Sequence, residues 1–346
     1  MLRCGLRLFI SLWLWFSGLI LLAISGLSQG TPLLVDLATA ENGAALYIND
    51  PHTRISAPLL RIETSASTLI ERSPDGRILL VLDQASGQGN FVFSGGVIQP
   101  IDLTPGTRKI AWKPDSSELL LIGQSETGNW LIERVQIADF QMHTAFLPDT
   151  LHLTAMSAIR WLSADRLRIV TPTDSHVYLD ELVLKSMLPD PLQIWEFPTR
   201  VRQQPLILTD TPGFILPAET PDSLNYELYF FVVGSEEIRN LSNNPTRNDT
   251  YPVLSLDEQT LLYRAHSGIS QSIVEQNLLS QEARHLHFDA DARMVGFRLS
   301  PDQTLLAFIR SSPGQDHICV LDRNTEAVIC PVQGDHLVDF RWWDSR

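Results

Sequence analysis

The chain has 346 residues, of which 44% are hydrophobic and 19% are charged, and its formal net charge is −14. Its length exceeds that of a typical single domain, although repeat architectures reach this size as one unit, and its apolar content is sufficient for a full core. The acidic balance argues against nucleic acid or an anionic membrane surface as the partner and leaves cations, basic protein patches and neutral ligands.

Residues 8–27 are an uninterrupted, largely apolar segment that follows Arg3 and Arg7. The segment is long enough to span a bilayer as a helix, and the preceding arginines place the N-terminus in the cytoplasm. The alternative is a cleaved signal peptide, because residues 26–28 provide small side chains where cleavage occurs. We expect residues 1–30 to anchor a propeller that lies in the periplasm or on the cell surface, or to direct its secretion if the segment is cleaved.

From Thr31 onward, short β-prone runs alternate with Pro, Gly, Asn and Asp, without a long amphipathic helix. The first three runs predict strands at Leu33–Leu37, Ala44–Ile48 and Ile55–Ile62.

A strand–turn–strand pattern then repeats along the chain. It is clearest at Phe297–Arg310, where Ser300-Pro301-Asp302-Gln303 has the composition of a turn and a β-prone run follows. The turn aspartate recurs every 40 to 50 residues, at Asp75, Asp115, Asp257 and Asp302 and in weaker form at Asp165 and Asp210. Four strands with their turns need about this many residues, so each repeat predicts one blade of a β-propeller.

The two ends of the chain are expected to share one blade. Val338–Trp343 has the character of a first strand, whereas the strands after Thr31 lack one. Joining them would remove an exposed sheet edge. Residues 31–346 are therefore predicted to form one all-β propeller of seven four-stranded blades, or of six if the Asp210 region is an insertion.

The segment Asn225–Asp257 resembles the TolB-type, WD-like propeller repeat, in which a small-residue turn and a "Leu-Thr-Asn" stretch lead to the next "Ser-Pro-Asp-Gly" motif. The resemblance covers roughly residues 60–345 and departs from the consensus at Ala164, at Leu256 and in the Asp210 region. It implies the fold but not one function, because such repeats occur in periplasmic scaffold proteins, in peptidase propellers and in sensor ectodomains.

The repeated aspartates could form a ring of carboxylates, but an aspartate in a tight turn normally accepts hydrogen bonds from backbone amides two residues further on. We therefore predict a structural role for Asp75, Asp115, Asp257 and Asp302. Aromatic residues at repeating strand positions are usually core, which predicts that Trp112, Trp161 and Trp342 pack between blades.

The most suggestive polar cluster is His285, His287, Asp289 and Asp291. A strand would present these alternate residues on one face, as a metal site requires. Solvated side chains are normal in such a connection, however, and ligand spacing alone is only a hypothesis. We expect no metal and no cofactor, with these four residues as the candidates if a metal does bind.

The last predicted site is a disulfide between Cys319 and Cys330. Apolar runs flank the polar residues 323–326, which predicts a hairpin. Any symmetric turn centred between Asn324 and Thr325 places the two cysteines opposite each other, with Cα atoms about 4.5 to 5.5 Å apart. Buried free thiols are the alternative, and export to an oxidising compartment favours the bond.

No nucleophile elbow, phosphate-binding loop, His-Glu-x-x-His helix or dinucleotide-binding turn is present in the sequence. We therefore predict a noncatalytic, monomeric scaffold. It would be held to the membrane through residues 8–27 and would bind a protein or glycan partner, not nucleic acid, at a propeller face or channel. The alternative is a propeller enzyme, a lyase or hydrolase with a polar site at the channel mouth, since the fold itself excludes no chemistry.

Overall fold

The computed structural model describes residues 33–40, 43–49, 51, 56–62, 68–94, 97–106, 108–125, 127–197, 200–201, 203–209, 211–219, 225–334 and 337–343. The apolar segment 8–27 and its flanking arginines lie outside these residues. Within the described ranges, no helix has the length and hydropathy needed to cross a membrane.

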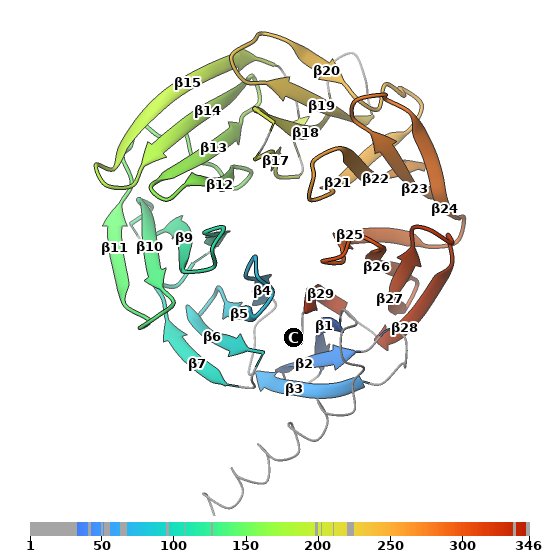
Figure 1. The fold of residues 1–346 in the computed structure, drawn as a ribbon, viewed down its shortest axis with the longest axis horizontal. Helices are drawn as coiled ribbons and strands as arrows, with labels where there is room; N and C mark the ends of the chain where they lie inside the picture. The colour runs from blue at the N-terminus through green and yellow to red at the C-terminus, as the bar shows by residue number, and fades with distance from the viewer. Residues whose placement is uncertain are drawn as a thin grey trace, which may run out of the picture.

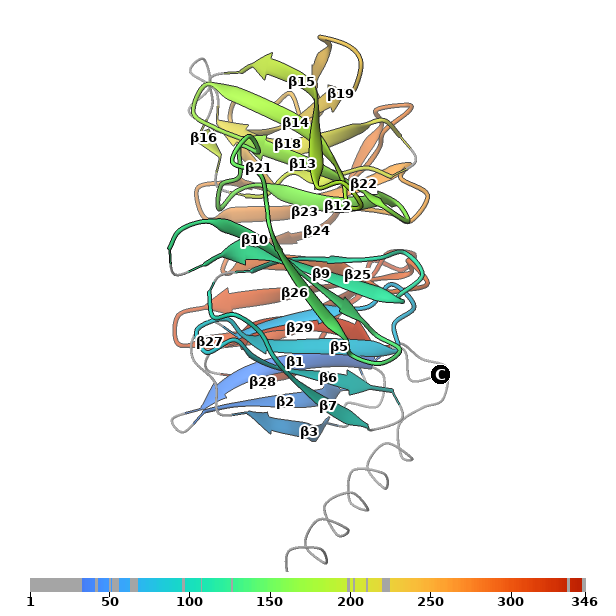
Figure 2. The ribbon, with the colours of Figure 1, turned by 90° about the vertical axis from the view of Figure 1, so that its left-hand side faces the viewer.

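Seven antiparallel sheets surround a central axis as the blades of a propeller (Figures 1 and 2). Blade 1 contains β4 (Thr68–Arg72), β5 (Ile78–Asp83), β6 (Gln88–Phe93) and β7 (Ile98–Asp102), and blade 2 contains β8 (Arg108–Trp112), β9 (Glu118–Gln124), β10 (Trp130–Gln136) and β11 (Met142–Phe146). Blade 3 contains β12 (Ala158–Ser163), β13 (Arg166–Pro172), β14 (His176–Val183) and β15 (Leu188–Glu196), and blade 4 contains β16 (Arg200–Val201), β17 (Leu206–Ile207), β18 (Gly213–Glu219), β19 (Tyr226–Val232) and β20 (Ile238–Asn240).

Blade 5 contains β21 (Asn248–Leu254), β22 (Thr260–Ser267), β23 (Ser270–Asn277) and β24 (Ala283–Asp289), and blade 6 contains β25 (Arg293–Leu299), β26 (Leu305–Ser312), β27 (Gln315–Asp322) and β28 (Val328–Gly334). Blade 7 contains β29 (Leu337–Trp343), β1 (Leu33–Ala40), β2 (Gly43–Asn49) and β3 (Ser56–Ile62). The prediction of an all-β propeller with seven blades is therefore confirmed.

The burial of each strand depends on its distance from the axis. Strands β5 and β9 are almost continuously buried, because neighbouring blades cover both faces of these sheets, and their sequences are accordingly unbroken apolar runs. All five residues of β11, at the outer edge of blade 2, are exposed. The core therefore lies between blades, and the outer strands form the rim.

Blade 7 combines the two ends of the described chain. Strand β29 pairs antiparallel with β1, with Leu33 opposite Trp343 and Asp36 opposite Phe340. Leu337, Phe340 and Trp342 are buried in a cluster that includes residues of β26 in blade 6. The last described strand thus supplies both a ladder partner for β1 and an apolar surface for its neighbour.

Blade 4 explains the weak repeat around position 210. Its first strand consists of two short pieces, β16 and β17, which both pair with β18. Pro205 lies between them, and a proline cannot donate a ladder hydrogen bond. This region is therefore a blade with an interrupted inner strand, and the six-blade alternative is wrong.

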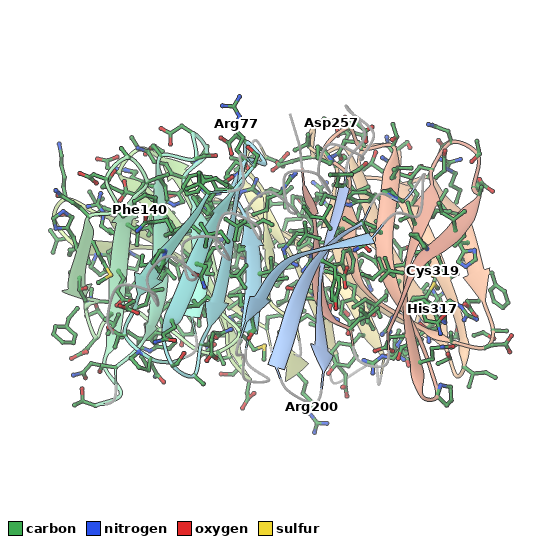
Figure 3. The ribbon with its side chains drawn as sticks, turned by 90° about the horizontal axis from the view of Figure 1, so that it is seen from below. Arg77, Phe140, Arg200, Asp257, His317 and Cys319 are labelled. Atoms are coloured by element: carbon green, nitrogen blue, oxygen red, sulfur yellow. A yellow bond between two sulfur atoms is a disulfide. The ribbon has the colours of Figure 1, made fainter. Side chains whose placement is uncertain are left out.

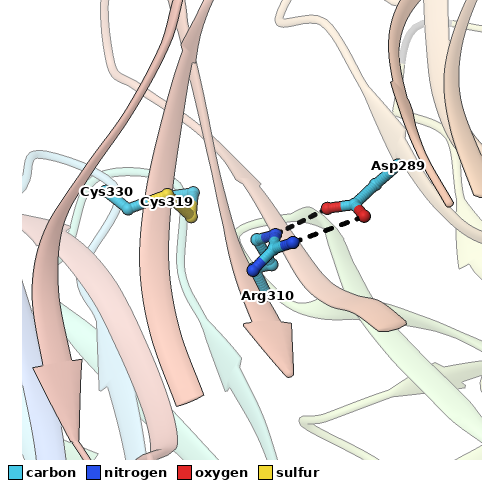
Figure 4. Close-up of a disulfide and its surroundings, with 4 residues drawn as sticks. All are labelled: Asp289, Arg310, Cys319 and Cys330. Atoms are coloured by element: carbon cyan, nitrogen blue, oxygen red, sulfur yellow. Dashed lines mark hydrogen bonds and ion pairs between the residues drawn. A yellow bond between two sulfur atoms is a disulfide. The ribbon is translucent and has the colours of Figure 1, made fainter. Parts of the chain in front are cut away.

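The predicted disulfide joins Cys319 on β27 to Cys330 on β28 (Figure 4). Val320 pairs with Ile329, as the symmetric hairpin requires, but the ladder changes register between Ile318 and Val320. The cysteine Cα atoms are 3.9 Å apart, closer than the regular pairing predicts. The difference arises because the cysteines lie at this irregularity in the ladder.

We expect iodoacetamide to label neither Cys319 nor Cys330 in denatured, unreduced protein, because the disulfide occupies both sulfurs. Mass spectrometry of the peptides that contain them should show both labels after reduction. Labelling of both thiols before reduction would contradict the bond. The bond closes a short loop, so its removal should affect mainly this hairpin.

Candidate functional site

The aspartates of the repeated turns are held within their own turns. In blade 1, Asp75 Oδ1 accepts hydrogen bonds from Ser73 Oγ at 2.6 Å and from the Arg77 amide at 3.1 Å. Asp115, Asp257 and Asp302 also accept hydrogen bonds from the amide two residues further on. Hydrogen bonds from the side chain and backbone of Ser117 hold the pKa of Asp115 below its ordinary value. The carboxylates thus stabilise separate turns.

In three of the four repeated turns, the residue after the aspartate also forms a hydrogen bond to the preceding blade, a contact that the sequence did not predict. Gly76 has the positive φ expected of glycine in this position, but Ser116, Glu258 and Gln303 also have φ values of 60°, 54° and 65°. Each of these three side chains reaches the preceding blade, where it accepts a hydrogen bond from the amide of Asp75, Thr211 or Leu256, respectively. The signal available in the sequence was a non-glycine residue where the consensus repeat has glycine.

Two of the three predicted tryptophans connect blades as well as pack between them. Trp161 Nε1 donates to the carbonyl of Ala111 at 2.9 Å, and Trp342 Nε1 donates to that of Arg298 at 2.9 Å. Both indole rings are almost fully buried. The indole of Trp112 lies edge-on to Phe91.

The two candidate histidines point to ordinary structural contacts. His285 Nδ1 shares a hydrogen bond with Ser272 Oγ at 3.1 Å, and the ring of His287 lies 6.1 Å from that of Phe308. Burial lowers the pKa of His287. The ladder between β23 and β24 changes register beside these residues, which interrupts the regular alternation on which the metal hypothesis depended.

The two candidate aspartates are held by other partners. Asp289 ends β24 and binds Arg310 of blade 6, with 2.6 Å between Oδ2 and Nε (Figure 4). It also accepts hydrogen bonds from the amides of Asp291 and Ala292, so Asp291 belongs to the following turn. Among the residues that the structure describes, no group of three or more His, Cys, Asp or Glu side chains could hold a metal ion.

A cavity of about 190 Å³ lies where the inner strands of blades 1, 6 and 7 end. We call it the arginine cavity; it is lined by Glu71, Arg72, Arg298, Leu299, Arg341 and Trp342. Arg72 and Leu299 immediately precede repeated turns, so the cavity lies toward the end of the propeller that carries these turns. We call this end the Ser-Pro-Asp face; Figure 3 shows Arg77 and Asp257 there and Arg200 at the opposite end.

Arg341 organises the charges at the cavity. Its Nη2 atom donates to Glu71 Oε2 at 2.6 Å, and its Nη1 atom donates to Asp339 Oδ1 at 2.6 Å. Only 11% of the side chain is exposed. Although burial acts to lower the pKa of Arg341, the carboxylates of Asp339 and Glu71 raise it above its ordinary value. Arg341 therefore joins blade 7 to blade 1.

Arg298 is held less completely. Its Nη1 atom donates to the carbonyl of Phe297 at 2.9 Å, and its Nη2 atom lies 3.9 Å from Asp339 Oδ1. The side chain is 39% exposed. The positive charge of Arg341, followed by burial, lowers the pKa of Arg298. In the sequence, both arginines directly follow a phenylalanine that the structure buries, Phe297 or Phe340, a repeated pair that could have identified them.

A second cavity, of about 330 Å³, lies toward the opposite end. Its lining residues are Thr154, Ala155, Met156, Pro172, Thr173, Asp174 and Val201. Nearby, Lys109 Nζ donates to the carbonyl of Ala155 at 2.8 Å, and burial lowers the pKa of this lysine to about 8. Asp174 is the one ionisable residue in its described lining, so this cavity offers fewer charged groups to a ligand than the arginine cavity does.

A buried polar cluster between blades 4 and 5 is inaccessible to a ligand. Asp249 is fully buried, with Oδ1 3.0 Å from Arg247 Nε. Burial raises the pKa of Asp249 to about 7 and, together with the Asp249 charge, that of Tyr263 to about 12. Burial also raises the pKa of Glu227 on β19. We assign this cluster to the stability of the blade interface.

No protein-family model matches the sequence, and no curated protein matches it. Solved structures do match its fold. The β-propeller domain of the Trilobed protease from Pyrococcus furiosus has a TM-score of 0.63 and 12% identity, over 89% of this chain and 97% of that one. The periplasmic gluconolactonase PpgL of Pseudomonas aeruginosa has a TM-score of 0.62 and 14% identity, over 90% and 99% of the chains.

TolB from Acinetobacter baumannii has a TM-score of 0.52 and 10% identity, over 90% of this chain and 83% of that one. The Pyrococcus domain is described as having an open velcro topology, whereas β29 and β1 of this chain pair in one sheet. At these identities the similarity concerns the fold alone. The chain is thus a seven-bladed β-propeller that is similar in fold to these three proteins.

Proposed function

We propose that this protein is a noncatalytic, membrane-anchored propeller outside the cytoplasm that binds a protein partner on its Ser-Pro-Asp face, around the arginine cavity. The observation that supports this proposal most strongly is the cavity itself, in which three arginines surround a space between blades at that face.

The chemistry of the cavity suits binding better than proton transfer. A guanidinium group stays protonated in proteins, so it presents fixed hydrogen-bond donors and does not act as an acid or base. Glu71 and Asp339 are both hydrogen-bonded to Arg341. Among its lining residues, all of which are described, there is no His, Cys, Ser or Lys.

The location outside the cytoplasm rests on two features. Residues 8–27 have the length and the preceding arginines of a signal-anchor. The Cys319–Cys330 bond is of a kind that persists in oxidising compartments and is rare in the cytosol.

The proposal can be tested by photo-crosslinking of the full chain in its own membranes. Leu256 and Ile269 form a matched pair, because they are 74% and 79% exposed and lie in turns at opposite ends of β22. A photoreactive residue at position 256, on the Ser-Pro-Asp face, should give a discrete crosslinked protein. The same residue at position 269 should not.

Equal crosslinking from both positions, or crosslinking from position 269 alone, would overturn the assignment of the binding face. The anchor is judged in the same preparation by fractionation and N-terminal sequencing. A mature chain that begins near Gln29 and is recovered in the soluble fraction would show that the segment is a cleaved signal.

The alternative function is a propeller enzyme, a lyase or hydrolase. It is favoured by the two carboxylates, Glu71 and Asp339, that Arg341 holds beside the cavity, because paired carboxylates can serve as acid and base. Lyase or hydrolase activity of the purified protein would support this alternative if both Glu71→Gln and Asp339→Asn abolish that activity. If the photoreactive residue at position 256 crosslinks a glycan and no protein, the proposal of a protein partner is wrong.

A further inference from the structure

We propose that the arginine cavity binds a single carboxylate, from an acidic side chain of the partner polypeptide, and that Arg298 is its principal hydrogen-bond donor. This inference rests on the proposed function and specifies the chemistry of the contact.

Arg298 has donor capacity that its described neighbours use only in part. A guanidinium carries five N–H donors in a planar fork that matches a carboxylate. Arg298 makes one hydrogen bond to the carbonyl of Phe297 and lies 3.9 Å from Asp339, which is beyond ordinary hydrogen-bond length. Asp339 instead lies 2.6 Å from Arg341. A carboxylate entering the cavity could therefore form the close pair with Arg298 that Asp339 does not.

The local charge favours an anion. Glu71 and Asp339 both lie 2.6 Å from Arg341, whereas the guanidinium of Arg298 lies 3.9 Å from Asp339. Arg298 and Arg341 repel each other, which is why the pKa of Arg298 is lowered. A bound anion would relieve that repulsion in a space partly shielded from water, where charge interactions are stronger than at the open surface.

Two observations favour a single acidic side chain over a polyanion. The chain as a whole carries a formal charge of −14, so an extended polyanion would be repelled outside the cavity. The volume of about 190 Å³ is smaller than the roughly 300 to 1,000 Å³ of typical small-molecule sites, and suits one side chain better than an oligosaccharide.

Ligand-observed NMR with the purified full chain in detergent provides the test. The probe is acetyl-Gly-Glu-Gly-amide, and its control is acetyl-Gly-Gln-Gly-amide, which has nearly the same shape without the charge. We expect the glutamate peptide to bind with a dissociation constant on the order of 1 mM and the glutamine peptide to give no signal. Binding should weaken as salt is added.

The matched variants are Arg298→Gln and Arg200→Gln. Arg200 is 78% exposed at the opposite end of the propeller, so its replacement should leave peptide binding unchanged (Figure 3). Arg298→Gln should weaken binding roughly tenfold or more, as loss of a charged hydrogen bond implies. Arg298→Lys keeps the charge without the fork and should fall between the two, which provides a second measure if Arg298→Gln does not fold.

Equal binding of the two peptides would overturn the proposal, as would unchanged binding by a folded Arg298→Gln protein or no binding of the glutamate peptide. Inorganic phosphate and galacturonate are the competitors. Displacement of the peptide by either at equal concentration would show a general anion site or a sugar-acid site instead. Peptide binding needs no native partner, so the two experiments can be judged separately. If crosslinking succeeds but the glutamate peptide does not bind, only this inference is refuted. If the peptide binds but crosslinking fails, only the proposed function is refuted.

Discussion

Deletion of residues 337–346 is expected to abolish the cooperative unfolding transition of the propeller. The deletion removes β29, so β1 keeps its pairing with β2 but loses its other neighbour and becomes an edge strand of blade 7. It also removes Leu337, Phe340 and Trp342 from the apolar cluster with blade 6. Thermal unfolding followed by circular dichroism should show a broad, noncooperative change in place of a single transition.

A pair of point variants checks that the effect comes from this strand. Phe340 is 1% exposed, so Phe340→Ala should lower the free energy of unfolding by about 3 to 5 kcal/mol. Phe146 is 67% exposed on β11, and Phe146→Ala should change it by less than about 0.5 kcal/mol. A deletion protein that unfolds like the full chain would show that the shared blade is unimportant for folding.

The second large effect is expected from pH. Because the pKa of Asp249 is raised to about 7 in the folded protein, the folded state binds a proton more tightly than the unfolded state does. The stability from this proton is fully present below the unfolded pKa and is lost as the pH rises through about 7. Between about pH 4 and about pH 8 the loss should reach about 4 kcal/mol.

Urea unfolding of the wild type and of Asp249→Asn across this range isolates the contribution. The difference in free energy of unfolding, wild type minus variant, should become more negative as the pH rises. The buried Asp36, whose pKa burial raises to about 6, is present in both proteins and cancels. Asp115→Asn is the control of opposite sign, because the pKa of Asp115 is lowered and its contribution is lost as the pH falls. Parallel pH profiles for wild type and Asp249→Asn would contradict the assignment.

The sequence predicted the fold well because the repeat acts locally. A turn such as Ser300–Gln303 and the apolar run after it specify a strand pair without reference to distant residues, and the recurrence of that pair gives the blades. The disulfide followed in the same way from a hairpin. Blade 4 was harder to predict, because the residues that mark the repeated turn are missing around its interrupted inner strand. The two pieces of that strand nevertheless pair with β18.

The repeated Phe-Arg pair could have marked Arg298 and Arg341, but the arginine cavity as a whole could not be predicted, because its residues are distant in sequence. Glu71 and Arg341 are 270 positions apart and meet only after the ring closes. His285 and Asp289 show the opposite case, in which residues close in sequence do not form the expected site. Their spacing suggested a shared metal site, but the ladder between β23 and β24 changes register beside His285, and Asp289 binds Arg310 of the next blade.

The side chains of Ser116, Glu258 and Gln303 also limit how this protein can be redesigned. A consensus approach would restore glycine at these positions and relieve a left-handed backbone that costs a non-glycine residue roughly 1 to 2 kcal/mol. Each replacement would also delete hydrogen bonds to the previous blade, one at Ser116 and at Gln303 and two at Glu258, each worth about 0.5 to 1.5 kcal/mol or more for a carboxylate. The relief of backbone strain and the loss of hydrogen bonds are similar in size. The consensus sequence of the repeat is therefore a poor guide to which substitutions would stabilise this propeller.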